Sequence, residues 1–185
     1  MSHTPGATSG VRRAQKQKTR QALLDAALAL LEDQSLSSLG LREVTRAVGI
    51  APTAFYRHFR DTADLGVALV DETLGSLHGP IRTTLATTGG SEERIAGTVE
   101  LIAALVRDFP AHVRFLVRER HGGVRAVRDA IGGQLDRFAS EVADELARLP
   151  ESRGWRRDDL LMLAGLYVDL MVMTASAFLA AGPAP

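Results

Sequence analysis

The stretch GIAPTAFYRHF at residues 49–59 places side chains that could contact a polyanion beside side chains that could anchor a helix. The hydroxyl of Tyr56 and the imidazole of His58 can donate hydrogen bonds to phosphate oxygens. Phe55 and Phe59 are four residues apart, so they share one face of a helix. The segment therefore predicts a short helix that is held by its aromatic face and presents its polar face to nucleic acid.

Charge is distributed unevenly along the chain, although its formal net charge is zero. Residues 1–60 contain nine lysine and arginine residues against four acidic residues, a balance of +5, so residues 61–185 carry −5. A basic N-terminal module joined to an acidic remainder indicates a protein that binds a polyanion through one end. Solvated helix faces are the alternative explanation for the same charges.

Apolar residues recur at helical spacing along the chain, and the alternating β-branched runs that mark strands are missing, which predicts an all-α protein. We expect Gly49 to adopt the left-handed conformation that ends a helix, and Asp61 to cap the N-terminus of another. The expected helices cover 11–32, 41–48, a segment beginning at 52, a segment from 62 into the eighties with a kink at 78–80, 91–109, 110–120, 124–149 and 158–181.

Two short helices joined by a tight turn that contains glycine form a helix-turn-helix, and LREVTRAV, GIA and PTAFYRHF follow one another at that spacing. An ordinary hairpin in a helical bundle is the alternative. The apolar side chains expected to hold both helices against the first one are Leu41, Val44, Val48, Ile50, Phe55 and Phe59. The side chains expected to face outward, toward DNA, are Arg42, Thr45, Arg46, Thr53, Ala54, Tyr56, Arg57 and His58.

Enzymatic activity finds little support in the residue types. The chain has no cysteine, and its five histidines show neither an i, i+4 pair nor a His-x-x-Glu spacing. Glycine-rich phosphate loops and nucleophile-elbow motifs are also missing. We therefore expect no catalytic residues, no metal and no cofactor. A helical binding module without DNA affinity is a further alternative, and the basic cluster at residues 12–20 argues against it.

The final helix, LLMLAGLYVDLMVMTASAFLAA, is long enough to cross a bilayer. Asp169 argues against a membrane span, because a carboxylate at mid-bilayer costs roughly 2.5 kcal/mol or more. We expect a dimer or core helix instead, and no membrane association. Residues 1–10 are polar, unlike a signal peptide, and predict a disordered tail; together with the lack of cysteine they indicate a cytoplasmic protein.

The segment LREVTRAVGIAPTAFYRHFRDTADL, residues 41–65, resembles the N-terminal DNA-binding domain of the TetR family of bacterial transcriptional regulators. The positions that match the family pattern are Leu41, Gly49, Thr53, Tyr56, His58, Phe59 and Leu65. The resemblance implies a three-helix DNA-binding domain at residues 11–60 and a helical ligand-binding and dimerisation domain at residues 61–185. It also implies a homodimer on a palindromic operator, controlled by a hydrophobic small molecule.

More narrowly, RAQKQKTRQALLDAAL, GIAPTAFYRHFRD and FLVRER are similar to FabR-like repressors of unsaturated fatty-acid biosynthesis. This resemblance implies that long-chain acyl-CoA or acyl-ACP is the ligand and that lipid-metabolism genes are the targets. A TetR-type repressor of another regulon, such as efflux or catabolism, that senses a different hydrophobic molecule is the alternative.

Two positions depart from the family pattern. Thr62 stands where many members have a lysine that contacts phosphate, so we expect Arg60 to take over that contact; Arg60 and Pro52 complete the candidate DNA-binding set. Members usually dimerise through two C-terminal helices, and this sequence indicates only the first of them before Pro185. Either one helix forms the interface or a last helix is missing.

The candidate ligand-pocket residues are apolar or aromatic and could equally be ordinary core, because a pocket for an acyl chain is itself apolar. They are Leu101, Leu105, Phe109, Phe115, Leu116, Phe138, Leu166 and Tyr167. The motif RERH at residues 118–121 predicts either a buried ion network or an anion site for a thioester head group.

Overall fold

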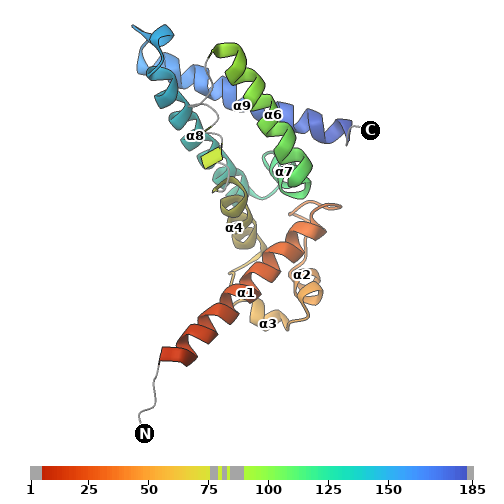
Figure 1. Cartoon of the computed structure of the whole chain (residues 1–185). Coiled ribbons are helices and arrows are strands. Elements are labelled where there is room, and N and C mark those ends of the chain that lie inside the picture. Colours follow the sequence, from red (N-terminus) through yellow and green to blue (C-terminus); the bar gives the residue numbers. More distant parts are fainter. Residues whose placement is uncertain (1–5, 76–78, 81–82, 84–89, 183–185) are drawn as a thin grey trace.

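The computed structural model describes residues 6–75, 79–80, 83 and 90–182, and every regular element within these ranges is a helix (Figure 1). This confirms the predicted all-α class. The elements are α1 (Gly6–Leu30), α2 (Leu41–Val48), α3 (Pro52–Phe55), α4 (Thr62–Gly75), α6 (Ser91–Asp108), α7 (Pro110–Glu119), α8 (Arg125–Ala147), the 3₁₀ turn η1 (Pro150–Ser152) and α9 (Arg157–Ala181). The kink predicted at residues 78–80 lies partly outside the described residues.

The helices gather at two ends of the molecule (Figure 1). At one end α1 packs against α2, and α2 against α3; at the other, α9 packs against α6, α7 and α8. Helix α4 leads from the first group to the second and packs against α8 as well as α1. The N-terminal half of α1 extends past α2 and α3 in Figure 1.

Helix α3 is shorter than the helix predicted to begin at Pro52. After Phe55 the chain tightens, because the N–H of Arg57 bonds to the carbonyl of Ala54 at 3.2 Å and the N–H of His58 to the carbonyl of Phe55 at 2.8 Å. These i to i+3 bonds are typical of 3₁₀ geometry, which often ends a helix. The polar residues 56–58 consequently lie on a tightened turn that follows a single turn of α-helix.

Two apolar cores hold the helices together. The first contains buried residues of α1 to α4 and continues past residue 60 into the far group through Phe115 of α7 and Val127 of α8. The second lies between α6, α8 and α9 around Phe138 and Val168. The first core joins the two groups of helices, and the division of the chain after Arg60 stays a prediction.

The last turn of α7 also holds the loop between α1 and α2. The guanidinium of Arg118 donates to the carbonyl of Leu31 at 2.8 Å and to that of Gln34 at 2.6 Å. Glu119, which is 1% exposed, accepts the N–H of Leu36 at 2.9 Å. We call Arg118 and Glu119 the α7 clamp. The partners of the α7 clamp are backbone groups of the loop, which differs from the ion network and the anion site expected for RERH. Arg120, the next residue of that motif, does form an ion pair, with Asp169 of α9.

Gly66 of α4 lies where this loop meets α8. A Cβ atom at this position would come within 2.4 Å of Leu36 Cδ2 and 2.8 Å of Val127 Cγ2. Both neighbouring side chains are almost fully buried, at 1% and 0% exposed, so neither has room to withdraw. The lack of a side chain at Gly66 is therefore what allows α4, the loop and α8 to approach one another.

We expect Gly66→Ala to lower the free energy of unfolding by about 1–3 kcal/mol, because the added methyl group overfills a close-packed junction. Gly75→Ala is the matched control, since Gly75 is also on α4 and is exposed, and a Cβ atom there would meet nothing within 4 Å. The control should leave stability unchanged or raise it slightly. Urea denaturation of the two variants and the wild type measures the difference, and equal midpoints for both variants would contradict the packing described here.

Candidate functional site

The turn between α2 and α3 is fixed by backbone hydrogen bonds. Gly49 has φ of 73°, in the left-handed region, as the sequence predicted. Its N–H bonds to the carbonyl of Arg46 at 3.1 Å, and the N–H of Ile50 bonds to the carbonyl of Thr45 at 3.0 Å. This pair of bonds is the Schellman motif that ends helices. Pro52 then opens α3, where the N–H that proline lacks is not needed.

Aromatic packing holds α3 in place from the inside. Phe55 and Phe59 are 0% and 3% exposed, and their ring centroids are 5.6 Å apart. The guanidinium of Arg20, on α1, lies over the ring of Phe59 at 4.7 Å from the centroid, a cation–π contact. The predicted anchoring role of the two phenylalanines is thus realised, and α1 takes part in it.

Most of the candidate DNA-binding side chains lie on the surface of this unit. Arg42, Arg46, Pro52, Thr53, Tyr56, Arg57 and Arg60 are exposed, and Ala54 and His58 are half-buried. Tyr56 is 63% exposed, and its ring contacts Phe55 edge to face at 5.9 Å between centroids, so its hydroxyl group is free to reach outward. The structure thus brings nine of the ten candidates to the surface of α2, α3 and the turns that follow them.

Thr45 is the exception among these candidates, because it faces the interior. It is 1% exposed, and its hydroxyl donates to the carbonyl of Arg42 at 3.3 Å. Thr45 follows the fully buried Val44, so both lie on the face of α2 that packs inward. The α-helical period places Leu41, Val44, Thr45 and Val48 on that side, which the outward assignment of Thr45 overlooked.

His58 is surrounded by positive charge. Burial is the main cause that lowers its pKa below the usual value, and the charges of Lys16, Arg20 and Arg57 lower the pKa further. Its Nδ1 atom is buried and has no hydrogen-bond partner among the described residues. Burial and these charges both favour the neutral imidazole, which lies among cations that belong to α1 as well as to the turn.

Arg60 and two aspartates form the start of α4. The guanidinium of Arg60 pairs with Asp64 at 3.0 Å, and the backbone N–H of Arg60 donates to the same carboxylate at 2.9 Å. Both hydrogen bonds lower the pKa of Asp64, and the bond from the guanidinium has the larger effect. Asp61 accepts the N–H of Asp64 at 2.7 Å, which makes it the predicted N-cap of α4. Arg60 remains largely exposed, so the ion pair orients it without burying it.

A cavity of about 100 Å³ lies among α4, α6, α7, α8 and α9. Among the described residues that line the cavity, Gln134 is the one with a polar side chain, and its amide donates to Asp71 at 3.0 Å. Every other lining side chain is apolar: Leu74, Ile102, Leu105, Val106, Val113, Leu116, Val117, Leu135, Phe138, Val168, Met171, Val172 and Ala175. The cavity can therefore hold a small uncharged molecule, and none of the lining residues that the structure describes carries a charge.

Three of the eight candidate pocket residues line this cavity, and the other five lie elsewhere. Leu105, Leu116 and Phe138 line the cavity; Leu101 and Tyr167 are half-buried outside its lining; Phe115 is in the first core; Phe109 and Leu166 are 53% and 62% exposed. Apolar periodicity locates buried faces but does not reveal where two faces leave a gap. Gln134 is the residue from which the cavity could have been located in the sequence. It is a polar residue one helical turn before Phe138 on an otherwise apolar helix face.

Helix α9 exposes an apolar stripe on the side away from the second core. The stripe consists of Met162, Leu166, Leu170 and Met173, each 59–66% exposed and separated by three or four residues. By length and composition alone α9 could also cross a membrane, a test that core helices of soluble proteins pass too. Its carboxylate Asp169 forms an ion pair with Arg120, at the end of α7.

Residues 23–69 match the model of the bacterial regulatory proteins of the tetR family. FadR from Bacillus subtilis, solved in complex with stearoyl-CoA, superimposes with a TM-score of 0.63 at 14% identity, covering 86% of this chain and 95% of that one. The chain has the TetR-family fold. NalD, the secondary repressor of the MexAB-OprM multidrug efflux pump in Pseudomonas aeruginosa, gives a TM-score of 0.64 at 19% identity, over 90% of this chain and 86% of that one.

A gamma-butyrolactone receptor, described as an ArpA-like protein, gives a TM-score of 0.61 at 22% identity, over 89% of this chain and 85% of that one. The matched family segment begins within α1 and ends within α4, so it contains the helix-turn-helix described above. In the described parts of the chain, no three histidine, aspartate or glutamate side chains are placed to hold a metal ion.

Proposed function

We propose that this protein is a DNA-binding transcriptional regulator that contacts its operator through α2, α3 and the turn at residues 56–58. The observation that carries the proposal is a set of exposed polar and basic side chains on the helix-turn-helix. Backbone hydrogen bonds fix the turn of this unit, and Phe55 and Phe59 anchor it to α1. Arg46, Tyr56 and Arg57 are exposed together on this unit, where they can donate to phosphates or base edges. The tetR family match over residues 23–69 supports the same role.

The regulator acts as a homodimer on a palindromic operator. A two-fold pair of helix-turn-helix units reads two half-sites in successive major grooves. The apolar stripe of α9 supports this assembly, because four large exposed side chains in a row favour burial against a partner. The same stripe on a second copy supplies the self-complementary surface that a two-fold axis requires. Packing of α9 against α6, α7 and α8 supports this role over a membrane span.

A small, uncharged, apolar molecule controls DNA binding from the cavity. An engineered apolar cavity of roughly 150 Å³ in another protein binds benzene, so the present cavity suits a ligand of about that size. Leu116 and Val117 of α7 line the cavity, and the α7 clamp follows them directly in sequence. A ligand that displaces α7 would therefore move the loop that precedes α2, and so shift the population of DNA-competent molecules.

Long-chain acyl-CoA or acyl-ACP is the second candidate ligand, which would make this cytoplasmic protein a repressor of fatty-acid genes. The structural likeness to FadR in complex with stearoyl-CoA favours it, and the likeness to NalD favours a repressor of an efflux or catabolic regulon. The lining, which is apolar except for the amide of Gln134, supports the small ligand over the thioester, whose head group is charged. Neither ligand requires catalysis, a metal or a cofactor.

We expect Arg46→Glu to abolish sequence-specific binding to the DNA upstream of the protein's own gene, because the exposed guanidinium is replaced by a charge that phosphates repel. Arg153→Glu, an exposed arginine beside η1, is the charge-matched control and should keep operator affinity within about twofold. Fluorescence anisotropy with operator and scrambled DNA measures both. Unchanged helicity by circular dichroism shows that folding is intact, and normal operator affinity of Arg46→Glu would contradict the proposed interface.

We expect Leu166→Lys combined with Met173→Lys to convert the dimer to a monomer, because two buried ammonium groups oppose association. Ile95→Lys, another exposed apolar position but on α6, should leave the dimer intact. Size-exclusion chromatography with light scattering gives the mass of each. A dimer that survives the double substitution would show that the subunits associate through another surface.

We expect toluene to raise the melting temperature of the wild type and not that of Ala175→Phe, whose added ring fills the cavity. Ala180→Phe, at an exposed position of α9, serves as the control and should respond like the wild type. Oleoyl-CoA is tested in parallel by thermal shift and by its effect on operator binding. A shift with oleoyl-CoA alone would favour the acyl-thioester candidate, and an equal toluene shift in all three proteins would exclude the cavity as its site.

A further inference from the structure

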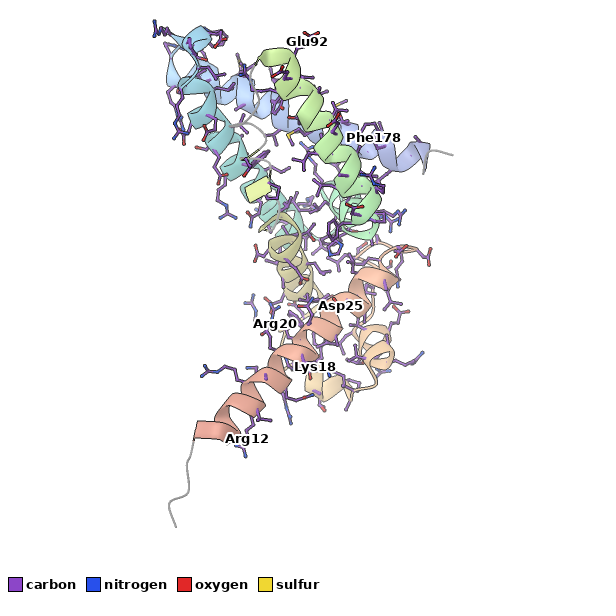
Figure 2. The ribbon with its side chains drawn as sticks, viewed as in Figure 1. Arg12, Lys18, Arg20, Asp25, Glu92 and Phe178 are labelled. Carbon is purple, nitrogen blue, oxygen red and sulfur yellow. The ribbon has the colours of Figure 1, made fainter. Side chains whose placement is uncertain are left out.

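The N-terminal half of α1 carries a stripe of positive charge. Arg12, Lys16 and Arg20 follow one another at intervals of four residues, so they project from one face of the helix. Lys18 projects from the opposite face, since two residues correspond to about 200° of rotation. Figure 2 shows Arg12 near the free end of α1 and Arg20 closer to α4. We call Arg12, Lys16 and Arg20 the α1 stripe.

The α1 stripe is unfavourable for the free protein. Like charges four residues apart repel one another across one helical turn and so destabilise the helix. The first acidic residue of α1 is Asp25, and neither Arg12 nor Lys16 forms an ion pair within the described ranges. Both side chains are exposed, so no apolar packing compensates for the repulsion. An external polyanion would turn this repulsion into attraction.

The stripe runs toward the helix-turn-helix. Its last member, Arg20, lies over the ring of Phe59, which anchors the turn at residues 56–58. Lys16 and Arg20 are also among the charges that act on His58 in this turn. Lys16 and Arg20 therefore lie close to the turn at residues 56–58. Arg12 continues the stripe toward the free end of α1 (Figure 2).

We propose that Arg12 and Lys16 bind backbone phosphates of the DNA flanking the half-site, so that α1 lengthens the stretch of operator that each subunit contacts. The stripe is about 12 Å long, since each residue of a helix rises 1.5 Å, and phosphates recur along one strand every 3.4 Å or so of helix axis. These contacts add affinity without sequence preference, because phosphates are the same at every base pair. The inference rests on the proposed DNA-binding function.

The test compares Arg12→Gln combined with Lys16→Gln against Lys18→Gln, which removes a charge from the opposite face of the same segment. For each protein, anisotropy titrations over a salt series give the slope of log K against log [salt]. Loss of two phosphate contacts per subunit should reduce the magnitude of this slope by about 1.8 per subunit and weaken operator and scrambled DNA by the same factor. Lys18→Gln should match the wild type.

Hydroxyl-radical footprinting and NMR give independent readouts. The protected region should shorten at its outer edges in the double variant and keep its length in Lys18→Gln. Lys16→Gln should raise the pKa of His58, because a nearby positive charge is removed, whereas Lys18→Gln should not. An unchanged slope and footprint with intact operator binding would overturn this inference alone. Failure of the wild type to bind any DNA would overturn both this inference and the proposed function.

Discussion

The buried hydrogen bond between the carboxylate of Glu119 and the N–H of Leu36 is the interaction on which the arrangement of the two helix groups depends. Taking a carboxylate out of water is costly unless its oxygens are bonded, and the second oxygen of Glu119 has no hydrogen-bond partner among the described residues. The bond to Leu36 is therefore the one compensation that the described side chains and backbone give it. Loss of that bond would leave the carboxylate buried and unsatisfied, so the loop is held firmly against α7.

Burial of apolar side chains reinforces this polar contact. The side chain of Leu36, whose N–H makes this bond, lies in the first core. There it packs beside Val127 in the space that the missing side chain of Gly66 leaves. Arg118 meanwhile saturates carbonyl groups at the C-terminal end of α1, which would otherwise lack partners. The loop between α1 and α2 thus contacts α4, α7 and α8. These three contacts together set the orientation of the helix-turn-helix that follows the loop.

Local chemistry made part of this structure predictable from the sequence. The bounds of α2, the left-handed Gly49, the N-cap Asp61 and the aromatic anchor at Phe55 all depend on neighbouring residues, and each was predicted. The tightened turn after Phe55 and the gap beside Gln134 were not predicted, because they depend on how whole helices meet. The inward face of Thr45 was missed for another reason, since the helical period already places Thr45 on the side of Val44 and Val48. The α7 clamp shows the same limit: RERH suggested partners of opposite charge, since charged side chains usually find them. Arg118 and Glu119 instead bond backbone groups more than eighty positions earlier in the chain, which only the tertiary fold brings near.

The connection between α2 and α3 is short and constrained. Three residues separate the two helices; Gly49 and Ile50 are tied back to α2, and Ala51 leads directly into the ring of Pro52. We therefore expect α2 and α3 to keep their relative orientation when the rest of the molecule moves. A signal from the far group of helices would then change where this pair of helices lies, and not the surface that the pair presents.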